Sequence, residues 1–206
     1  MNRFIERFQY LDKLASIDTY IINKGHSSIV FLGGCRSIYL CIFFEEICKN
    51  LSYFQHAQFG LSTLSVYNIK QTKSPNVINV IENADLIICE QLRSYKELNT
   101  SPKCDKNIFN SFNIKQNCKI IQIPNLEYYT KEYDLTMVVS QCKKYNFNKV
   151  AEYIYNNIQN KELFVTCNHP SNSLILELFK ELCEICFNQQ LPKKIVDELN
   201  KIVIFI

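Results

Sequence analysis

Short apolar runs bounded by polar residues recur along this chain. The clearest are Ser28–Gly34, Asp85–Cys89 and Lys119–Pro124, and two further runs, Leu61–Lys70 and Glu162–Thr166, are rich in β-forming residues. Bounded runs of this length are typical of buried strands. Strands that are apolar along most of their length favour a parallel sheet covered by helices on both faces. The pattern therefore predicts five strands.

Between these runs, apolar positions recur at the spacing of a helix face. This spacing predicts helices over residues 2–16, about 36–49, 147–158 and 174–187, and a short amphipathic helix within residues 192–206. An apolar strand followed by a helical stretch, repeated along a chain, is typical of α/β proteins.

Four segments have weaker patterns. Asp18–Ser27 is predicted to be a connector, and Pro75 opens a helical or irregular piece that ends near Glu82. The polar segment 93–117 is predicted to hold a loop and one short helix. Residues 125–145 form a long connection without clear structure, and connections of that length are often functional.

Together these elements predict an α/β fold, a three-layer, doubly wound, mostly parallel five-stranded sheet of the flavodoxin-like type. With 206 residues, the chain suits a single domain with a substantial core. We expect an N-terminal helix and connector over residues 1–26, an α/β core over 27–187 and a C-terminal appendage over 188–206.

The composition and net charge of the chain bear on whether it binds nucleic acids or membranes. The chain carries 23 basic and 20 acidic residues, a net charge of +3, without a long run of one sign. Such a balance predicts no nucleic-acid partner and no attraction to anionic membranes. No stretch approaches the roughly 20 apolar residues of a membrane span, and the N-terminal residues lack the apolar core of a signal peptide. We therefore expect a cytoplasmic protein, and no oligomeric state is predicted.

The 10 cysteines are expected to be thiols in a reducing compartment. The pair Cys183 and Cys186 has CxxC spacing but lies within a predicted helix, where core packing is the simpler interpretation. No metal cofactor is predicted.

Polar residues follow the predicted strands at their carboxyl ends. Cys35 follows the first strand, Gln91 the third, Asn125 the fourth, and Asn168 and His169 the fifth. In doubly wound sheets, ligands bind in the crevice beyond these ends. The sequence therefore predicts that these side chains converge on one edge.

Cys35 and His169 are the candidate catalytic residues. Cys35 lies after a strand and a Gly-Gly pair and just before a helix, where helix N–H groups and the helix dipole lower the pKa of a thiol. His169 lies between a strand and a helix, where it could serve as a general base or acid. The alternatives are a small apolar cysteine at a crowded turn and a hydrogen-bonded structural histidine.

Four ordered motifs resemble those of the WcbI-type polysaccharide biosynthesis proteins. They are Gly33-Gly-Cys-Arg36, the segment from Asp85 to Gln91, Ile121-Gln-Ile-Pro-Asn125 and Thr166-Cys-Asn-His-Pro170, within about residues 28–187. The resemblance implies a fold like that of the SGNH hydrolases, with cysteine in place of serine. It also implies that coenzyme A or acetyl-coenzyme A is bound as substrate, and that the chain is an acetyltransferase acting on capsular or other surface polysaccharide.

Under this resemblance Cys35 attacks the thioester and His169 deprotonates the sugar hydroxyl. A non-covalent variant, in which His169 is the base and Cys35 only lines the pocket, is equally open. The oxyanion and substrate-binding candidates are Gly34, Arg36, Ser37, Gln91, Asn125 and Asn168. Arg36 could also pair with coenzyme A phosphates.

The chain departs from the family pattern at several of these positions. Gly34 stands where the family has asparagine, Arg36 where it has glutamine, and Thr166 where SGNH enzymes carry an aspartate three residues before the histidine. Two other classes therefore stay open. One is an SGNH-like esterase or deacylase, and the other is a catalytically weak module that binds coenzyme A or sugar.

Overall fold

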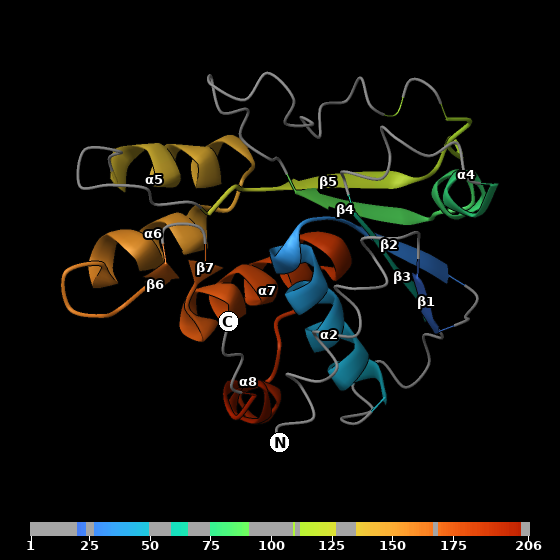
Figure 1. The fold of residues 1–206 in the computed structure, drawn as a ribbon. Helices are drawn as coiled ribbons and strands as arrows, with labels where there is room; N and C mark the ends of the chain where they lie inside the picture. The colour runs from blue at the N-terminus through green and yellow to red at the C-terminus, as the bar shows by residue number, and fades with distance from the viewer. Residues whose placement is uncertain are drawn as a thin grey trace. The chain divides into compact units, whose positions relative to one another are not determined.

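We analysed a computed structural model, which describes residues 20–23, 27–49, 59–65, 75–90, 109, 112–126, 135–166 and 169–202 (Figure 1). The chain divides into two compact units, Met1–Gln122 and Ile123–Ile206. Each unit is described by itself, and the single domain expected from the sequence stays a prediction. The helix expected over residues 2–16 lies outside the described residues.

The first unit is built on a sheet with the strand order β1-β3-β2-β4-β5 (Figure 1). The strands are β1 (Tyr20–Asn23), β2 (Ser27–Gly33), β3 (Phe59–Ser65), β4 (Leu86–Glu90) and β5 (Lys119–Ile123). β2 runs parallel to both β3 and β4, whereas β1 is antiparallel to β3. The α/β class and the parallel centre of the sheet are confirmed.

β1 was not predicted, because it lies within the segment interpreted as a connector. Its sequence, Tyr-Ile-Ile-Asn, is rich in β-forming residues, but it is too short to show alternation. β3 begins two residues before the predicted Leu61, and residues 66–74 lie outside the described part of the chain.

Helix α2 (Cys35–Lys49) contacts β2, β3 and β4. The ring of Phe31 in β2 lies 5.7 Å from that of Phe44 in α2, centroid to centroid. Every described side chain from Arg36 to Phe44 is buried, and the run from Ile38 to Phe44 is apolar on every side of the helix, which is typical of a protein interior. The prediction of a helix directly after the first strand is confirmed.

Helix α4 (Pro75–Glu82) packs against different β2 side chains. Because side chains alternate along a strand, Val30 and Leu32 belong to a different cluster from Phe31, one that contains Val77 and Ile81 of α4. Both faces of this part of the sheet are therefore covered by helices, as the apolar strands predicted.

The second unit is mainly helical. Its helices are α5 (Leu135–Lys144), α6 (Asn148–Asn157), α7 (Asn172–Phe187) and α8 (Lys193–Asn200), and each contacts the next. α6, α7 and α8 match predicted helices. α5 contradicts the expectation that residues 125–145 form a connection without clear structure. Only Val138 and Cys142 of this helix are buried, and two apolar positions are too few to show the spacing of a helix face.

The prediction that Glu162–Thr166 forms a fifth strand of the main sheet is wrong. β6 (Phe164–Thr166) pairs antiparallel with β7 (His169–Pro170) in a separate two-stranded sheet. The Ser171 N–H donates to the Leu163 carbonyl at 2.8 Å, so this backbone pairs with residues just downstream. Val165 is exposed, unlike the side chains of a parallel strand covered on both faces.

In the described ranges, no helix combines the length and apolar character needed to cross a bilayer.

Candidate functional site

The chain passes from β2 into α2 through a single residue. β2 ends at Gly33, Gly34 makes the bend, and α2 begins at Cys35. The Ser37 N–H donates to the Gly34 carbonyl at 3.1 Å and so closes the first turn. Cys35 therefore lies at the N-terminus of the helix, as predicted, and the helix begins one residue before the predicted start near residue 36. Its side chain lies outside the description.

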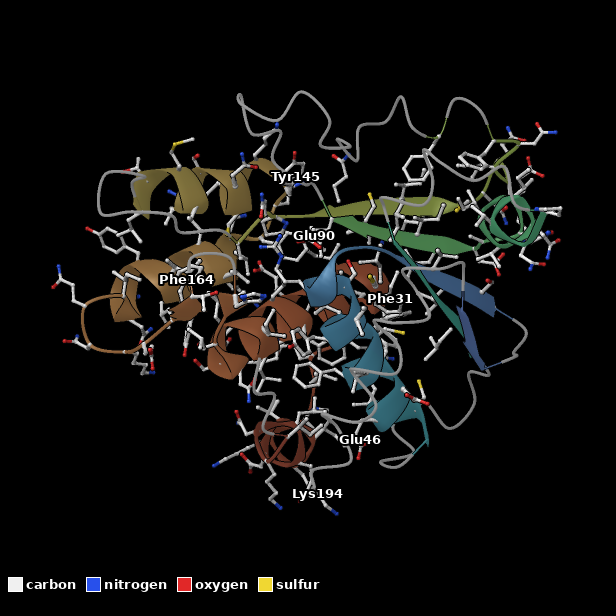
Figure 2. All side chains as sticks on the ribbon, viewed as in Figure 1. Phe31, Glu46, Glu90, Tyr145, Phe164 and Lys194 are labelled. Carbon is white, nitrogen blue, oxygen red and sulfur yellow. The ribbon has the colours of Figure 1, made fainter. Side chains whose placement is uncertain are left out.

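A buried carboxylate is the centre of this turn. Glu90 is the last residue of β4, and its Oε2 accepts hydrogen bonds from the Gly34 N–H at 2.9 Å and, weakly, from the Ser37 hydroxyl at 3.5 Å. Its Oε1 accepts from Nε of Arg36 in an ion pair. Arg36 and Glu90 are 4% and 0% exposed. Figure 2 labels Glu90 beside the first turn of α2.

Gly33 is required here by close packing. A Cβ at this position would lie 2.1 Å from Ser37 Oγ and 2.7 Å from Glu90 Cβ, whereas a Cβ on Gly34 would lie 3.6 Å from Glu90 Oε2, an ordinary contact. Neither glycine has a positive φ. Gly33 therefore lets β4 approach the turn, while the space beside Gly34 admits a side chain.

Glu90 was not predicted as a site residue; its neighbour Gln91, which lies outside the described residues, was chosen instead. A signal was present, because an acidic residue closes an otherwise apolar run and would need a partner if buried. Arg36, after the neighbouring parallel strand, is that partner. The phosphate contact predicted for Arg36 stays untested, but its guanidinium already pairs with Glu90.

The negative charge of Glu90 lies where a helix favours an anion, at the N-terminus of α2. The N-terminus of a helix favours an anion through the dipole and its N–H groups, and the Glu90 carboxylate accepts such an N–H at the start of α2. A buried ion pair tolerates loss of one partner poorly, because the other charge is left uncompensated. The arrangement can fix the first turn of α2 firmly against β4.

In the second unit, His169 lies opposite Thr166 in the β6–β7 pair. The Thr166 hydroxyl and His169 Nδ1 are 2.5 Å apart, a hydrogen bond. Thr166 occupies the position at which the sequence comparison expected an aspartate. A hydroxyl can hold the imidazole ring in one orientation, but unlike a carboxylate it adds no charge to stabilise an imidazolium.

Asn125 is buried, 4% exposed, and follows β5 after Pro124. Within the described part of the chain, neither its Oδ1 nor its Nδ2 has a hydrogen-bond partner. Buried amides are nearly always paired, because leaving one unpaired costs about 1–3 kcal/mol. The substrate-binding role predicted for Asn125 stays a prediction.

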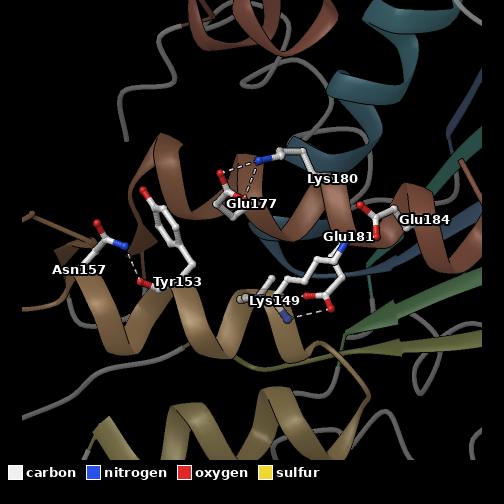
Figure 3. A network of polar contacts seen from close by, with 8 residues as sticks. Lys149, Tyr153, Asn157, Glu177, Lys180, Glu181 and Glu184 are labelled. Atoms are coloured by element: carbon white, nitrogen blue, oxygen red, sulfur yellow. Dashed lines mark hydrogen bonds and ion pairs between the residues drawn. The ribbon is translucent and has the colours of Figure 1, made fainter. Parts of the chain in front are cut away.

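A surface pocket of about 250 Å³ also lies in the second unit, between α6 and α7. Its charged lining residues are Lys149, Glu177, Lys180, Glu181 and Glu184. Lys149 pairs with Glu184, and Lys180 pairs with Glu177 at 2.8 Å (Figure 3). Glu181 accepts two backbone N–H groups. Each of these charged side chains therefore already has a partner within the protein.

The structure thus brings together Gly34, Arg36 and Ser37, three of the predicted residues. Gln91 and Asn168 lie outside the described residues. Cys35 belongs to the first unit and His169 to the second, so their pairing stays a prediction. Among the residues the structure describes, no three His, Cys, Asp or Glu side chains are grouped as metal ligands.

The fold and turn define a class: an α/β protein whose sheet has parallel strands β3-β2-β4 at its centre and a cysteine opening the helix after β2. A solved structure of similar fold is WcbI, described as a novel polysaccharide biosynthesis enzyme, in a form without a disulfide bond between coenzyme A and one of its cysteines. The TM-score is 0.52 at 12% identity, over 82% of this chain and 71% of that chain.

This likeness confirms, at the level of the fold, the resemblance that the sequence motifs predicted. No protein-family model and no curated protein matches the chain.

Proposed function

We propose that this chain is an acetyltransferase of polysaccharide biosynthesis, which takes an acetyl group from coenzyme A and passes it to a saccharide hydroxyl. The observation that carries the proposal is the β2–α2 turn, which puts Cys35 at the first residue of a helix and ties that turn to Glu90. The fold is similar to that of WcbI, whose description names coenzyme A together with a cysteine of that protein.

In the first half-reaction, the Cys35 thiol gives its proton to His169 and the thiolate attacks the thioester carbonyl. A new S–C bond forms, the bond from the carbonyl carbon to the coenzyme A sulfur breaks, and His169 returns the proton to that sulfur. The product is an acetyl group on Cys35 and free coenzyme A. Partial charge at the helix N-terminus favours the thiolate.

In the second half-reaction, His169 takes the proton of the saccharide hydroxyl as its oxygen attacks the acetyl carbon. The bond to the Cys35 sulfur breaks, and the thiolate regains the proton from His169. Because the Gly34 N–H already donates to Glu90, the tetrahedral oxyanion needs other donors. Asn125, whose buried amide has no hydrogen-bond partner among the described residues, is a candidate for binding substrate polar groups.

The test measures free coenzyme A by chromatography after incubation with acetyl-coenzyme A, with and without methyl glycosides of glucose, galactose and mannose. A transferase releases coenzyme A faster when an acceptor is present. A hydrolase releases it equally without one. Cys35→Ser and His169→Ala should each lower the rate at least about 100-fold, whereas Cys118→Ser, at a partly exposed cysteine outside the turn, should not. Full activity in both Cys35→Ser and His169→Ala would overturn the assignment.

Two observations favour a second candidate, a module that binds coenzyme A without efficient transfer. The Gly34 N–H is occupied by a carboxylate, and the group beside His169 Nδ1 is a neutral hydroxyl. Calorimetry measures the binding of coenzyme A, and the chromatographic assay measures its release from acetyl-coenzyme A. Binding without release, whichever saccharide acceptor is added, identifies the binding module.

A further inference from the structure

We propose that Arg36 and Glu90 act together as positioning residues that set the charge around the start of α2, and through it the reactivity of Cys35. The inference rests on the proposed function in one respect, the choice of Cys35 as the reactive thiol. In this inference, Arg36 and Glu90 act on Cys35 through the first turn of α2 and do not touch the substrate.

The geometry supports a role beyond holding the fold together. The Glu90 carboxylate reaches three groups of one short turn: the Gly34 N–H, the Arg36 side chain and the Ser37 hydroxyl. All the contacts therefore flank Cys35 in the sequence. A buried ion pair adds little net stability compared with apolar side chains of similar size, so its presence beside a candidate nucleophile calls for another explanation.

The two charges have opposite effects on a thiolate at the helix N-terminus. The helix dipole favours an anion there, but the Glu90 carboxylate repels one, and the Arg36 guanidinium offsets that repulsion. With both residues present the pair is neutral, and the helix N-terminus can favour the thiolate. Loss of Arg36 removes one positive charge from the turn, whereas loss of Glu90 removes one negative charge.

Other charged groups on the described elements around the turn are remote from it. β2 and β3 carry no charged residue. The charged residues Glu45, Glu46 and Lys49 lie on α2 at least nine residues beyond Arg36, about 13 Å or more along the helix. Asp85 precedes β4 at the opposite end from Glu90 and pairs with Lys115. The other titratable groups of these elements that are buried are Tyr39, Cys41 and Cys89.

The experiment measures the alkylation rate of Cys35 by iodoacetamide as a function of pH, resolved by peptide mass spectrometry. The variants are Arg36→Gln, Glu90→Gln, the double variant and Arg36→Lys. Near neutral pH we expect about tenfold slower alkylation in Arg36→Gln and faster alkylation in Glu90→Gln. The double variant and Arg36→Lys should return toward the wild type.

Opposite shifts in the two single variants are the signature of a charge effect. Shifts of the alkylation rate in the same direction in both variants, or no shift, would overturn the proposal. Loss of packing alone would not depend on the sign of the charge that was removed. Cys41 is a fully buried thiol of the same unit as Arg36 and Glu90, so rapid alkylation of Cys41 reports an unfolded variant. If Glu90→Gln unfolds, the comparison of Arg36→Gln with Arg36→Lys still decides, since only Arg36→Gln should be slow.

Alkylation needs no acetyl-coenzyme A, so the two proposals fail separately. If the two single variants shift the alkylation rate of Cys35 in opposite directions but the protein transfers no acetyl group, this inference is supported and the proposed function is refuted. Acetyl transfer through Cys35 with no opposite shifts would keep the function and remove this inference.

Discussion

Gly33 and Gly34 are neighbours in the sequence, yet their surroundings differ sharply. A Cβ on Gly33 would overlap Ser37 and Glu90, while one on Gly34 would make an ordinary contact. We expect Gly33→Ala to lower the free energy of unfolding by about 1–3 kcal/mol through overpacking. Gly34→Ala, the matched control, should change it little. Urea denaturation followed by circular dichroism checks both, and equal losses in the two variants would contradict the packing of this turn.

The hydrogen bond between Thr166 and His169 predicts that Thr166 orients the imidazole. Thr166→Val keeps the side-chain shape but removes the hydroxyl, and should slow acetyl transfer by up to about 100-fold through misorientation of the base. Nitrogen NMR of His169 should show an altered tautomer population at the same time. Thr166→Ser restores a hydroxyl and should behave like the wild type; unchanged tautomers in Thr166→Val would refute the orienting role.

Glu90 shows which site residues a sequence can reveal. The strand–Gly-Gly–helix pattern predicted the place of Cys35, because the sheet-to-helix turn is encoded locally. Glu90 reaches that turn from 53 to 56 positions away along the chain, and its partner depends on which strands are neighbours. The acidic end of an apolar run signalled a buried charge but not where its partner lay.

Among the secondary-structure elements, α6 is held at its start by a neighbour. Its N-cap, Phe147, makes no side-chain hydrogen bond, and Glu181 of α7 accepts instead from the Lys149 and Val150 N–H groups at 3.0 and 2.8 Å. We expect Glu181→Ala to lower the free energy of unfolding by about 1–3 kcal/mol, since it leaves two N–H groups unpaired at a helix N-terminus.

Glu184→Ala is the matched control for this prediction. Glu184 lies on the same helix and pairs with the exposed ammonium of Lys149, and exposed ion pairs contribute little to stability. Urea titrations of the two variants should therefore differ clearly. Similar stability in Glu181→Ala and the wild type would show that α6 does not depend on this carboxylate.

Sequence patterns were most informative for elements with several buried positions. α7 has eight buried residues and was predicted within two residues of its start, whereas α5 has two and was missed. For β6, the apolar run indicated a strand but not its partner. Pairing is decided by the rest of the chain, and here residues 169–171 provide it.

At the scale of the molecule, Asp85 connects three segments of the first unit. It accepts from the Ser28 N–H and from Lys115 Nζ, both at 2.8 Å. The hydrogen bond from Lys115, then that from Ser28, lowers the pKa of Asp85 below its usual range. A lowered pKa stabilises the fold above the unfolded-state pKa near 4, and this contribution is lost as pH falls below that value.

We therefore expect Asp85→Asn to be less stable than the wild type at neutral pH, and the difference to shrink in acid, below about pH 4. The effect should be modest because the pair is partly exposed. Asp197→Asn, at an exposed position on α8, is the control. A difference between Asp85→Asn and wild type that does not depend on pH would contradict the account.

The central claim is that Cys35 carries the acetyl group during transfer. Brief exposure of the protein to acetyl-coenzyme A, followed by acid quenching and peptide mass spectrometry, tests it most directly. The account predicts an acetyl group on the peptide that contains Cys35, its absence in Cys35→Ser, and its loss when a saccharide acceptor is added. Turnover of acetyl-coenzyme A with no acetyl group on that peptide, and with Cys35→Ser as active as the wild type, would contradict it.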